Sequence, residues 1–269
     1  MKKVLTILLV LTLCFAAFAS GSKENAKGLI SEGKLIVATS PDYAPYEFYA
    51  IDANGNPHLA GFDMALAQYI ADYMGLELEV IPMDFDGILA EVQMGSVDLG
   101  ISGFSPTPER AEVVALSDVY YAGDQCFFCL KKNAKNFPNL EATNDAKWKL
   151  GAQTGSIQVG LAEENSPKAD IVKLTKVTDI VAEVLNGKLD GAYVETAVAE
   201  SYVKNYPELQ VCLPVPFDAE GNVVMAKKGS PLMAKVNEAI AKCISDGSMG
   251  AFIEKAGVDA SGDIIEGMI

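Results

Sequence analysis

Apolar and polar residues follow two different periods along this chain, and the two periods alternate. An apolar run from Lys34 to Ser40 predicts a buried strand, which ends in a Pro-flanked loop at 41–46. Residues 62–74 carry apolar side chains three or four positions apart, which mark one face of a helix, and Gly75 supplies its C-cap. Residues 76–81 alternate as a strand. This succession predicts an α/β fold with mostly parallel sheets and helices on both faces.

Two distant segments repeat one pattern. Residues 88–103 read ILAEVQMGSVDLGISG and residues 180–195 read IVAEVLNGKLDGAYVE, with identical residues at six of sixteen positions. Each predicts a short amphipathic helix, a glycine cap, an aspartate and a strand, so we expect two lobes built on the same βαβ plan. Because ligands in such folds bind beyond the carboxyl ends of the strands, the first copy points to residues 103–105 and the second to Glu195.

The stretch after the first copy, GFSPTPER at 103–110, predicts the start of a helix. Thr107 is a good N-cap and Pro108 suits the first helical position. Arg110 in the first turn opposes the helix dipole, typically at a cost of about 0.3–1 kcal/mol. One explanation is an exposed arginine paired with an acid; the other is a guanidinium that binds an anion together with the free N–H groups. A second helix start, at 153–157, follows a predicted strand at 148–152 and offers N–H groups in the same way.

Composition and the first residues narrow the class of protein. The 269 residues suffice for one large domain or two modest ones, and the net charge of −15 argues against nucleic acid and anionic membrane surfaces as partners. A basic start, an uncharged apolar run to residue 19 and a small-residue cleavage site at 17–19 predict a signal peptide over 1–19. The run is too short to favour a membrane anchor. Cys14 leaves lipid anchoring open as an alternative to a freely soluble exported protein.

Four further cysteines, Cys126, Cys129, Cys212 and Cys243, do not predict a metal site. Cys126 and Cys129 lie three apart on a predicted strand and therefore point to opposite faces, and His58 is the only histidine. We expect buried, unpaired cysteines. Export permits disulfides, but the sequence leaves their pairing open.

The two strand ends together suit a zwitterion. Arg110 can bind a carboxylate with help from N–H groups near Ser105 and from the second helix start, and Glu195 can accept from an ammonium. Tyr43 and Phe85, each beside a predicted strand end or helix start, can form flat apolar walls; packing in the core is the alternative.

Several stretches of the chain resemble a known protein family. The stretches FDMALAQYIADYMG, PMDFDGILAEVQMGSVDLGISGFSPTPERAEVVALSDVYY, GAQTGSIQ and GKLDGAYVE are similar to the polar amino-acid-binding family of extracytoplasmic solute-binding proteins, which serve ABC importers. The resemblance covers about residues 34–258. It implies a two-lobed periplasmic-binding-protein-like fold, with one lobe at 34–122 and 221–269, the other at 127–213, and hinge segments near 121–126 and 214–220.

The resemblance also implies a ligand site. Arg110 and Ser105 correspond to the family's carboxylate-binding positions, with second-lobe donors near Ser156 and Ile157. Glu195 corresponds to an acid that binds the ammonium, usually an aspartate, and the carbonyl of Gly103 assists it. Tyr43 and Phe85 fall on ring-stacking positions. Ile157 replaces a common threonine.

The side chain of the ligand is less defined. Ser40 stands where family members that bind basic side chains often carry aspartate, so Ser40 and Gln153 favour a neutral polar side chain. Asp42 and Glu47 are nearby acids whose negative charge would instead favour a cationic side chain.

The resulting hypothesis is a monomeric, periplasmic or extracellular binding protein that delivers a free amino acid to an ABC permease. It needs no cofactor, no metal and no catalytic residue. An exported enzyme of the dehydratase type on the same scaffold, acting on a small carboxylate with Glu195 as its acid or base, is the alternative.

Overall fold

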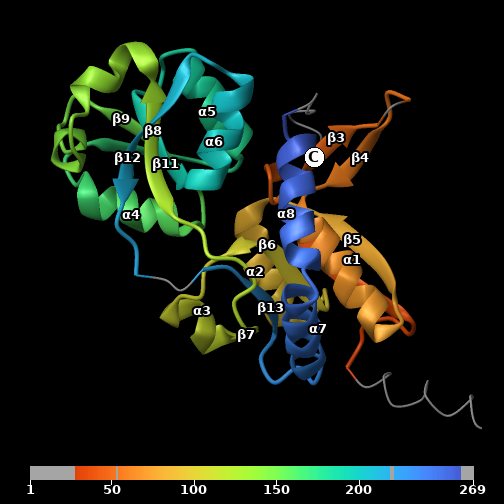
Figure 1. Cartoon of the computed structure of the whole chain (residues 1–269). Coiled ribbons are helices and arrows are strands. Elements are labelled where there is room, and N and C mark those ends of the chain that lie inside the picture. The colour runs from red at the N-terminus through yellow and green to blue at the C-terminus, as the bar shows by residue number, and fades with distance from the viewer. Residues whose placement is uncertain (1–27, 53, 219–220, 262–269) are drawn as a thin grey trace, which may run out of the picture.

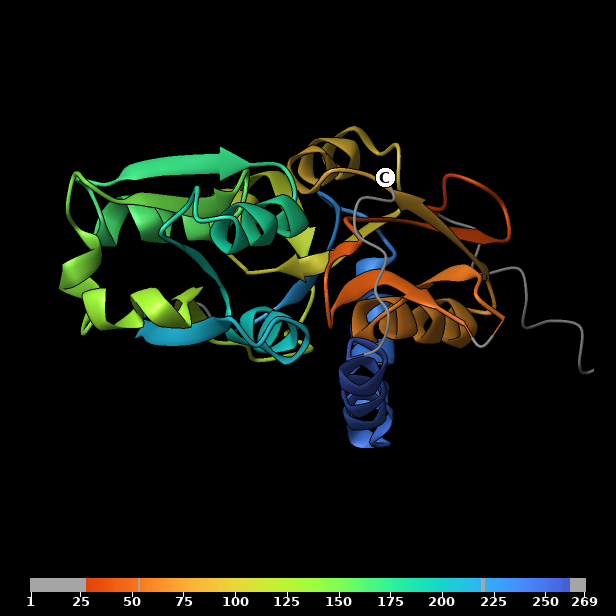
Figure 2. The ribbon, with the colours of Figure 1, turned by 90° about the horizontal axis from the view of Figure 1, so that it is seen from above.

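The computed structural model describes residues 28–52, 54–218 and 221–261. The expected signal peptide at 1–19 and Cys14 lie outside these residues. Two five-stranded sheets, each covered by helices, form two lobes joined by extended segments (Figures 1 and 2). The predicted two-lobed α/β fold is therefore confirmed.

The first lobe is built on the strand order β5-β1-β6-β13-β7. Apolar residues of β1, alternating by two, pack on opposite faces: Leu35 and Val37 face α1 and α7, and Ile36 and Ala38 face α2. The strands are β1 (Lys34–Thr39), β5 (Glu77–Pro82), β6 (Leu99–Phe104), β7 (Val114–Leu116) and β13 (Val223–Lys227); the helices are α1 (Phe62–Met74), α2 (Phe85–Met94), α3 (Pro108–Val113), α7 (Met233–Ser245) and α8 (Ser248–Asp259).

The second lobe has the order β10-β9-β11-β8-β12. Its strands are β8 (Gln125–Leu130), β9 (Lys149–Gln153), β10 (Asp170–Leu174), β11 (Gly191–Glu195) and β12 (Leu209–Val215). Its helices are α4 (Ile157–Asn165), α5 (Val177–Leu185) and α6 (Thr196–Asn205), with short 3₁₀ helices at Lys131–Asn136 and Leu140–Thr143.

The repeated segments adopt the same structure in both lobes. Each is a helix (α2, α5), a left-handed glycine (Gly95, φ 77°; Gly187, φ 71°) and a parallel strand (β6, β11). The shared aspartates have matching roles: Asp98 accepts from the N–H of Ile36 at 2.8 Å, and Asp190 accepts from the N–H of Lys149 at 2.9 Å. Each carboxylate thus binds the strand beside its own, which gives a physical reason for an aspartate at this place in both copies.

Both sheets contain more antiparallel pairing than the sequence suggested. Strands β5-β1-β6 and β10-β9-β11 are parallel, whereas β13 and β8 run antiparallel to their neighbours. β8 and β13 are the strands by which the chain enters each lobe after crossing between them. The crossings lie between β7 and β8 and between β12 and β13, and Tyr121 and Asn222 form a bridge between them. The chain enters each lobe at the carboxyl ends of its parallel strands. The entering strand therefore runs antiparallel to them.

The loop predicted at 41–46 contains a short strand, β2 (Asp42–Tyr43). With β3 (Glu47–Ile51) and β4 (Pro57–Ala60), it forms a small antiparallel sheet in the first lobe. The sheet places Asp42, Tyr43 and Glu47 beside the ends of β1 and β6, where the second lobe approaches.

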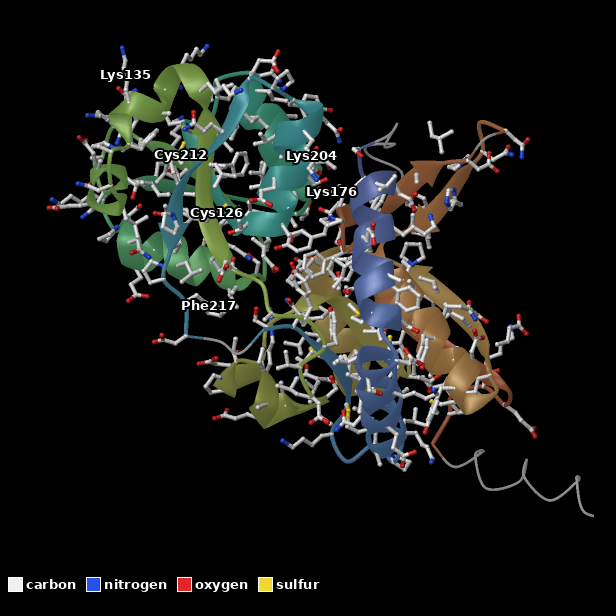
Figure 3. The ribbon with its side chains drawn as sticks, viewed as in Figure 1. Cys126, Lys135, Lys176, Lys204, Cys212 and Phe217 are labelled. Carbon is white, nitrogen blue, oxygen red and sulfur yellow. The ribbon has the colours of Figure 1, made fainter. Side chains whose placement is uncertain are left out.

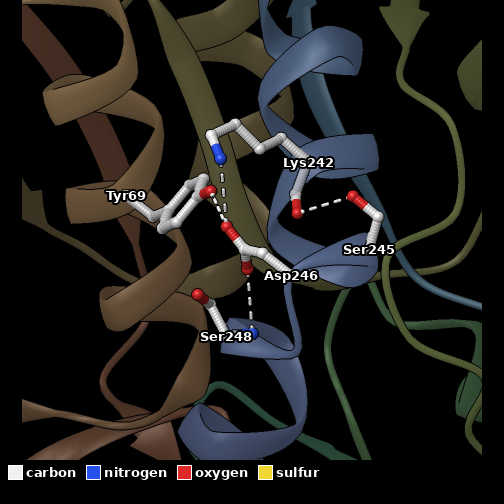
Figure 4. A network of polar contacts seen from close by, with 5 residues as sticks. All are labelled: Tyr69, Lys242, Ser245, Asp246 and Ser248. Atoms are coloured by element: carbon white, nitrogen blue, oxygen red, sulfur yellow. Dashed lines mark hydrogen bonds and ion pairs between the residues drawn. The ribbon is translucent and has the colours of Figure 1, made fainter.

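The two C-terminal helices are fastened to α1 by one carboxylate. Asp246, between α7 and α8, accepts from the hydroxyl of Tyr69 at 2.6 Å and from the N–H of Ser248 at 3.0 Å, and its ion pair with Lys242 spans 3.3 Å (Figure 4). These hydrogen bonds hold the pKa of Asp246 below its ordinary value. This network lies on the first lobe, away from the cleft.

Candidate functional site

A small cavity lies between the lobes, at the carboxyl ends of β6 and β9. The first lobe contributes six lining residues and the second contributes four: Tyr43, Phe85, Ser102, Gly103, Ser105 and Arg110, and Gln153, Ser156, Ile157 and Gln158. Eight of the ten residues predicted for the ligand site are therefore brought together. Ser40 and Glu195 do not line this cavity.

Arg110 enters the cavity from the first turn of α3, as its position after the Thr107 cap suggested. The backbone N–H of Arg110 donates to Thr107 Oγ1 at 3.3 Å. Its guanidinium carbon lies 5.0 Å from the ring centre of Phe104 and 5.8 Å from that of Phe85, and the two rings are stacked. Burial lowers the pKa of Arg110 to about 10, so the side chain keeps its positive charge at neutral pH.

The guanidinium also reaches the opposite lobe. It donates to the carbonyl oxygen of Ser105 at 2.9 Å and to that of Gly155 at 3.3 Å. Gly155 precedes Ser156, the N-cap of α4, whose first N–H groups have no partner within the helix. An anion at this point would meet a planar cation and a helix start together, which is the combination that binds carboxylates well.

Glu195 lies behind the cavity wall, where β11 meets the hinge. The carboxyl is 1 % exposed, its Oε1 has no hydrogen-bond partner among the described residues, and burial raises its pKa to about 8. A hydrogen bond with the side chain of Asn222 acts in the opposite direction. Asn222 Nδ2 also donates to the carbonyl oxygen of Gly103 at 2.8 Å. The two acceptors expected for an ammonium are thus both in contact with one amide.

Ser40 supports a second acid rather than facing the cavity. Its hydroxyl donates to Asp42 Oδ1 at 2.8 Å, and Asp42 Oδ2 accepts from Gln153 Nε2 at 3.2 Å and from the N–H of Val177 at 2.6 Å. Val177 begins α5, so a first-lobe carboxylate binds the start of a second-lobe helix. Burial raises the pKa of Asp42 to about 6, against these hydrogen bonds.

A pair of carboxyls lies deeper in the first lobe. Glu47 accepts from the hydroxyl of Ser102, which lines the cavity, and Asp63 accepts from the N–H of Gly103 at 2.8 Å and the hydroxyl of Tyr120 at 2.9 Å. Burial, and then the negative charge of Asp63, raise the pKa of Glu47 well above its ordinary value. The pair fixes Ser102 and Gly103 in place from behind.

Sequence reasoning missed three residues at this site. Ser102 adjoins Gly103, and Gln158 lies in the first turn of α4, so neighbouring positions carried a signal for both. Gln158 Nε2 donates to Gln125 Oε1 at 2.8 Å and to the hydroxyl of Tyr43 at 3.4 Å. Asn222 lies at the end of the second crossing, just before β13, and nothing in its local sequence indicates a role.

Comparison with known proteins places this geometry in a family. Residues 35–258 match the model of the bacterial extracellular solute-binding proteins, family 3. The chain belongs to this family. The predicted resemblance is confirmed, and a location outside the cytoplasm follows from the family.

Relatives and solved structures agree with this assignment. The arginine-binding extracellular protein ArtP of Bacillus subtilis is 34 % identical over 254 residues, covering 93 % of this chain and 95 % of the relative. A crystal structure of an amino-acid ABC transporter substrate-binding protein from Streptococcus pneumoniae bound to L-arginine has a TM-score of 0.82 and 33 % identity, covering 86 % and 97 % of the two chains. An ancestral amino-acid-binding protein described as a precursor of cyclohexadienyl dehydratase has a TM-score of 0.75 and 32 % identity, covering 83 % and 95 %.

Two further findings concern only residues 28–52, 54–218 and 221–261. No helix there has the length and apolar character needed to cross a bilayer. The same residues hold no cluster of His, Cys, Asp or Glu side chains placed to bind a metal ion.

Proposed function

We propose that this family 3 protein binds a free L-amino acid with a cationic side chain, L-arginine first, and delivers it to an ABC importer. The cavity between the lobes is the site, with Arg110 and the start of α4 binding the α-carboxylate. Relatives named as arginine-binding proteins and a similar structure containing L-arginine support this choice of ligand.

The excess of buried acids is the observation that supports a ligand with a cationic side chain. Arg110 is the one buried cation among the described residues of the cavity wall, whereas Asp42, Glu47, Asp63 and Glu195 are buried beside or behind it. Burial raises the pKa of each of these acids, and Lys176, beside Asp42, is the one positive charge that acts against it among the described residues. A ligand with two cationic groups and one carboxylate brings a net positive charge into this environment.

Gln153 gives the side chain of the ligand an acceptor. Its amide nitrogen donates to Asp42 and, at 3.1 Å, to the carbonyl oxygen of Thr175. Both amide hydrogens are therefore engaged, and the Oε1 carbonyl is the group that Gln153 can offer to the cavity. A donor-rich guanidinium suits this wall better than a side chain that needs donors. Asp42, two positions after Ser40, supplies the negative charge that Ser40 lacks.

A thermal-shift screen with the common amino acids, followed by calorimetry, tests the proposal. A ligand at about a hundredfold excess over its dissociation constant stabilises a protein by about 2.7 kcal/mol, or roughly 5–10 °C at this size. We expect arginine to give the largest shift. Citrulline, which has nearly the same shape without the charge, should bind at least about tenfold more weakly.

The outcomes of the screen separate the two parts of the proposal. Tight binding of citrulline or glutamine in preference to arginine would reject the cationic class but keep amino-acid binding. If no amino acid shifted the melting temperature, the proposed site itself would be wrong.

We propose further that the protein acts as an exported monomer without catalytic activity. The dehydratase alternative would use Glu195 as its acid, whereas the similar proteins are named as binding proteins, which favours binding without turnover. Incubation with candidate amino acids and small carboxylates, followed by chromatography, should return the ligand unchanged. Product formation would favour the enzyme.

A further inference from the structure

Two cysteine side chains meet inside the second lobe, on neighbouring strands. Cys129 lies on β8 and Cys212 on β12, and their Sγ atoms are 2.8 Å apart. Backbone register supports the contact: Cys129 pairs with Gln210, and the ladder shifts between Val211 and Leu213, so that Cys212 lies at an irregular position beside it. Cys126 and Cys212 are labelled in Figure 3 on these two strands.

We propose that Cys129 and Cys212 form a disulfide once the protein has left the cytoplasm. The family's extracellular location supplies the setting in which disulfides form and persist. The earlier expectation of buried unpaired cysteines then applies only to Cys126 and Cys243.

The geometry of β8 excludes Cys126, the other cysteine of the C-x-x-C stretch, as a disulfide partner of Cys129. Cys126 packs with Phe128 and Leu130 in the core shared with α5 and α6, whereas Cys129 packs with Phe127 on the opposite face, against which Cys212 lies. Residues three apart on a strand face away from each other. Cys129 therefore meets Cys212 and not Cys126.

The two thiols are suited to a stepwise oxidation by an external disulfide, either a small-molecule disulfide or a disulfide-carrying oxidoreductase. Cys212 is half-buried, and a hydrogen bond from Cys129 lowers its pKa, which favours its thiolate as the first nucleophile. The Cys212 thiolate attacks one sulfur of the oxidant and releases the other as a thiolate. Cys129 then loses its proton, attacks the Cys212 sulfur of the mixed disulfide and releases the second thiolate. The protein loses two hydrogens and the oxidant becomes two thiols.

The cross-link would stabilise the second lobe without reaching the cavity. It would close a loop that contains α4, α5, α6 and the strands β9, β10 and β11, and long closed loops restrict the unfolded chain most. Neither cysteine belongs to the cavity wall. We therefore expect reduction to lower the melting temperature and to leave ligand affinity unchanged, which makes this proposal independent of the proposed function.

Peptide mapping gives the direct test. The full-length chain is exported into an oxidising periplasm, alkylated under denaturing conditions without reductant, and digested with chymotrypsin. Cleavage after Phe127 or Phe128 separates Cys126 from Cys129, so the linked peptides identify the pair. We expect Cys129 linked to Cys212, with Cys126 and Cys243 alkylated. Alkylation of both Cys129 and Cys212, or a link through Cys126, would overturn the proposal.

Stability provides the second readout. Reductant should lower the melting temperature of the exported protein by roughly 10 °C, and Cys129→Ser and Cys212→Ser should each remove this sensitivity. Cys126→Ser is the matched control on the same strand and should keep it. A melting temperature of the exported wild type that does not respond to reductant would contradict the cross-link, even if the cysteine variants failed to fold.

Discussion

At the scale of single residues, Arg110 shows how a local misfit in the sequence can indicate function. A cation in the first turn of a helix is unfavourable, and Thr107 fixes that turn by accepting from the Arg110 N–H. The side chain is 7 % exposed and lies against two aromatic rings instead of an acid. The structure therefore confirms the predicted helix start and rules out an exposed arginine paired with a nearby carboxylate.

We predict that Arg110→Ala lowers ligand affinity by at least about thirtyfold, because loss of one partner of a buried charged pair typically costs about 2–5 kcal/mol. Arg110→Lys should recover only part of the loss, since an ammonium cannot make two parallel hydrogen bonds to a carboxylate. Lys228 is an exposed cation outside α3 that donates to the carbonyl of Ala111, a neighbour of Arg110 in α3. The Lys228→Ala variant should therefore bind the ligand normally. Calorimetry on folded variants decides the matter; unchanged affinity of Arg110→Ala would exclude the carboxylate role.

The residues that sequence reasoning could place are those with local signals. Gly75 was predicted as a helix cap and has φ 69°, and Thr107 was predicted as a cap and accepts as expected. The contacts of Asp42 and Asn222 were beyond reach for a physical reason. Asp42 meets Val177, 135 positions away, and Asn222 meets Gly103, 119 positions away. Such contacts depend on how the two lobes meet, which no local pattern encodes.

At the scale of elements, the repeated helix–glycine–strand unit was predicted correctly in both copies. The reason why both copies share this spacing is visible only in the structure. Asp98 both donates through its N–H to the carbonyl of Ile36 and accepts through its carboxylate from the N–H of Ile36; Asp190 does the same with Lys149. Each aspartate therefore fixes the register of the strand next to its own.

The two aspartates have equivalent roles but differ in burial and in number of contacts. We therefore expect their replacement to cause unequal losses of stability. Asp98 is 4 % exposed and accepts from a second N–H, that of Ile30, at 2.9 Å, whereas the single contact of Asp190 is exposed. We expect Asp98→Ala to lower the free energy of unfolding by about 2–3 kcal/mol and Asp190→Ala by about 1 kcal/mol. Urea unfolding of both variants measures the difference. A larger loss for Asp190→Ala would mean that the register-fixing role is wrong.

At the scale of the whole molecule, the structure is a form in which the lobes touch. Asp42 contacts Gln153 and Val177 of the second lobe, and Arg110 contacts Gly155. Proteins that close around a ligand exchange between such a form and an open one. Opening would return Asp42 and Glu195 to water, whereas Glu47 and Asp63 stay within the first lobe. The first two acids are therefore the groups whose ionisation is linked to closure.

The direction of this linkage follows from the pKa values. With the lobes in contact, burial raises the pKa of Glu195 to about 8 and that of Asp42 to about 6, whereas in an open form both should be near 4. Glu195 faces Tyr43, Tyr46, Gly123 and Asn222, none of them a cation; Asp42 faces Ser40, Gln153 and the start of α5, with Lys176 as the nearest positive charge. Closure without ligand takes up protons, so acid favours it.

We predict that the ligand-free protein becomes more compact as the pH falls from about 8.5 to 5. The ratio of closed to open molecules should rise by up to about tenfold per pH unit for each titrating group. Glu195→Gln carries no titrating proton and should be more closed at pH 8 and less sensitive to pH. The ligand-bound protein should show little dependence, because the cationic groups of the ligand stabilise both carboxylates in their charged forms. The radius of gyration from small-angle X-ray scattering measures each of these states. Expansion of the ligand-free wild type on acidification would contradict the linkage, since a raised pKa in the closed form requires the opposite sign.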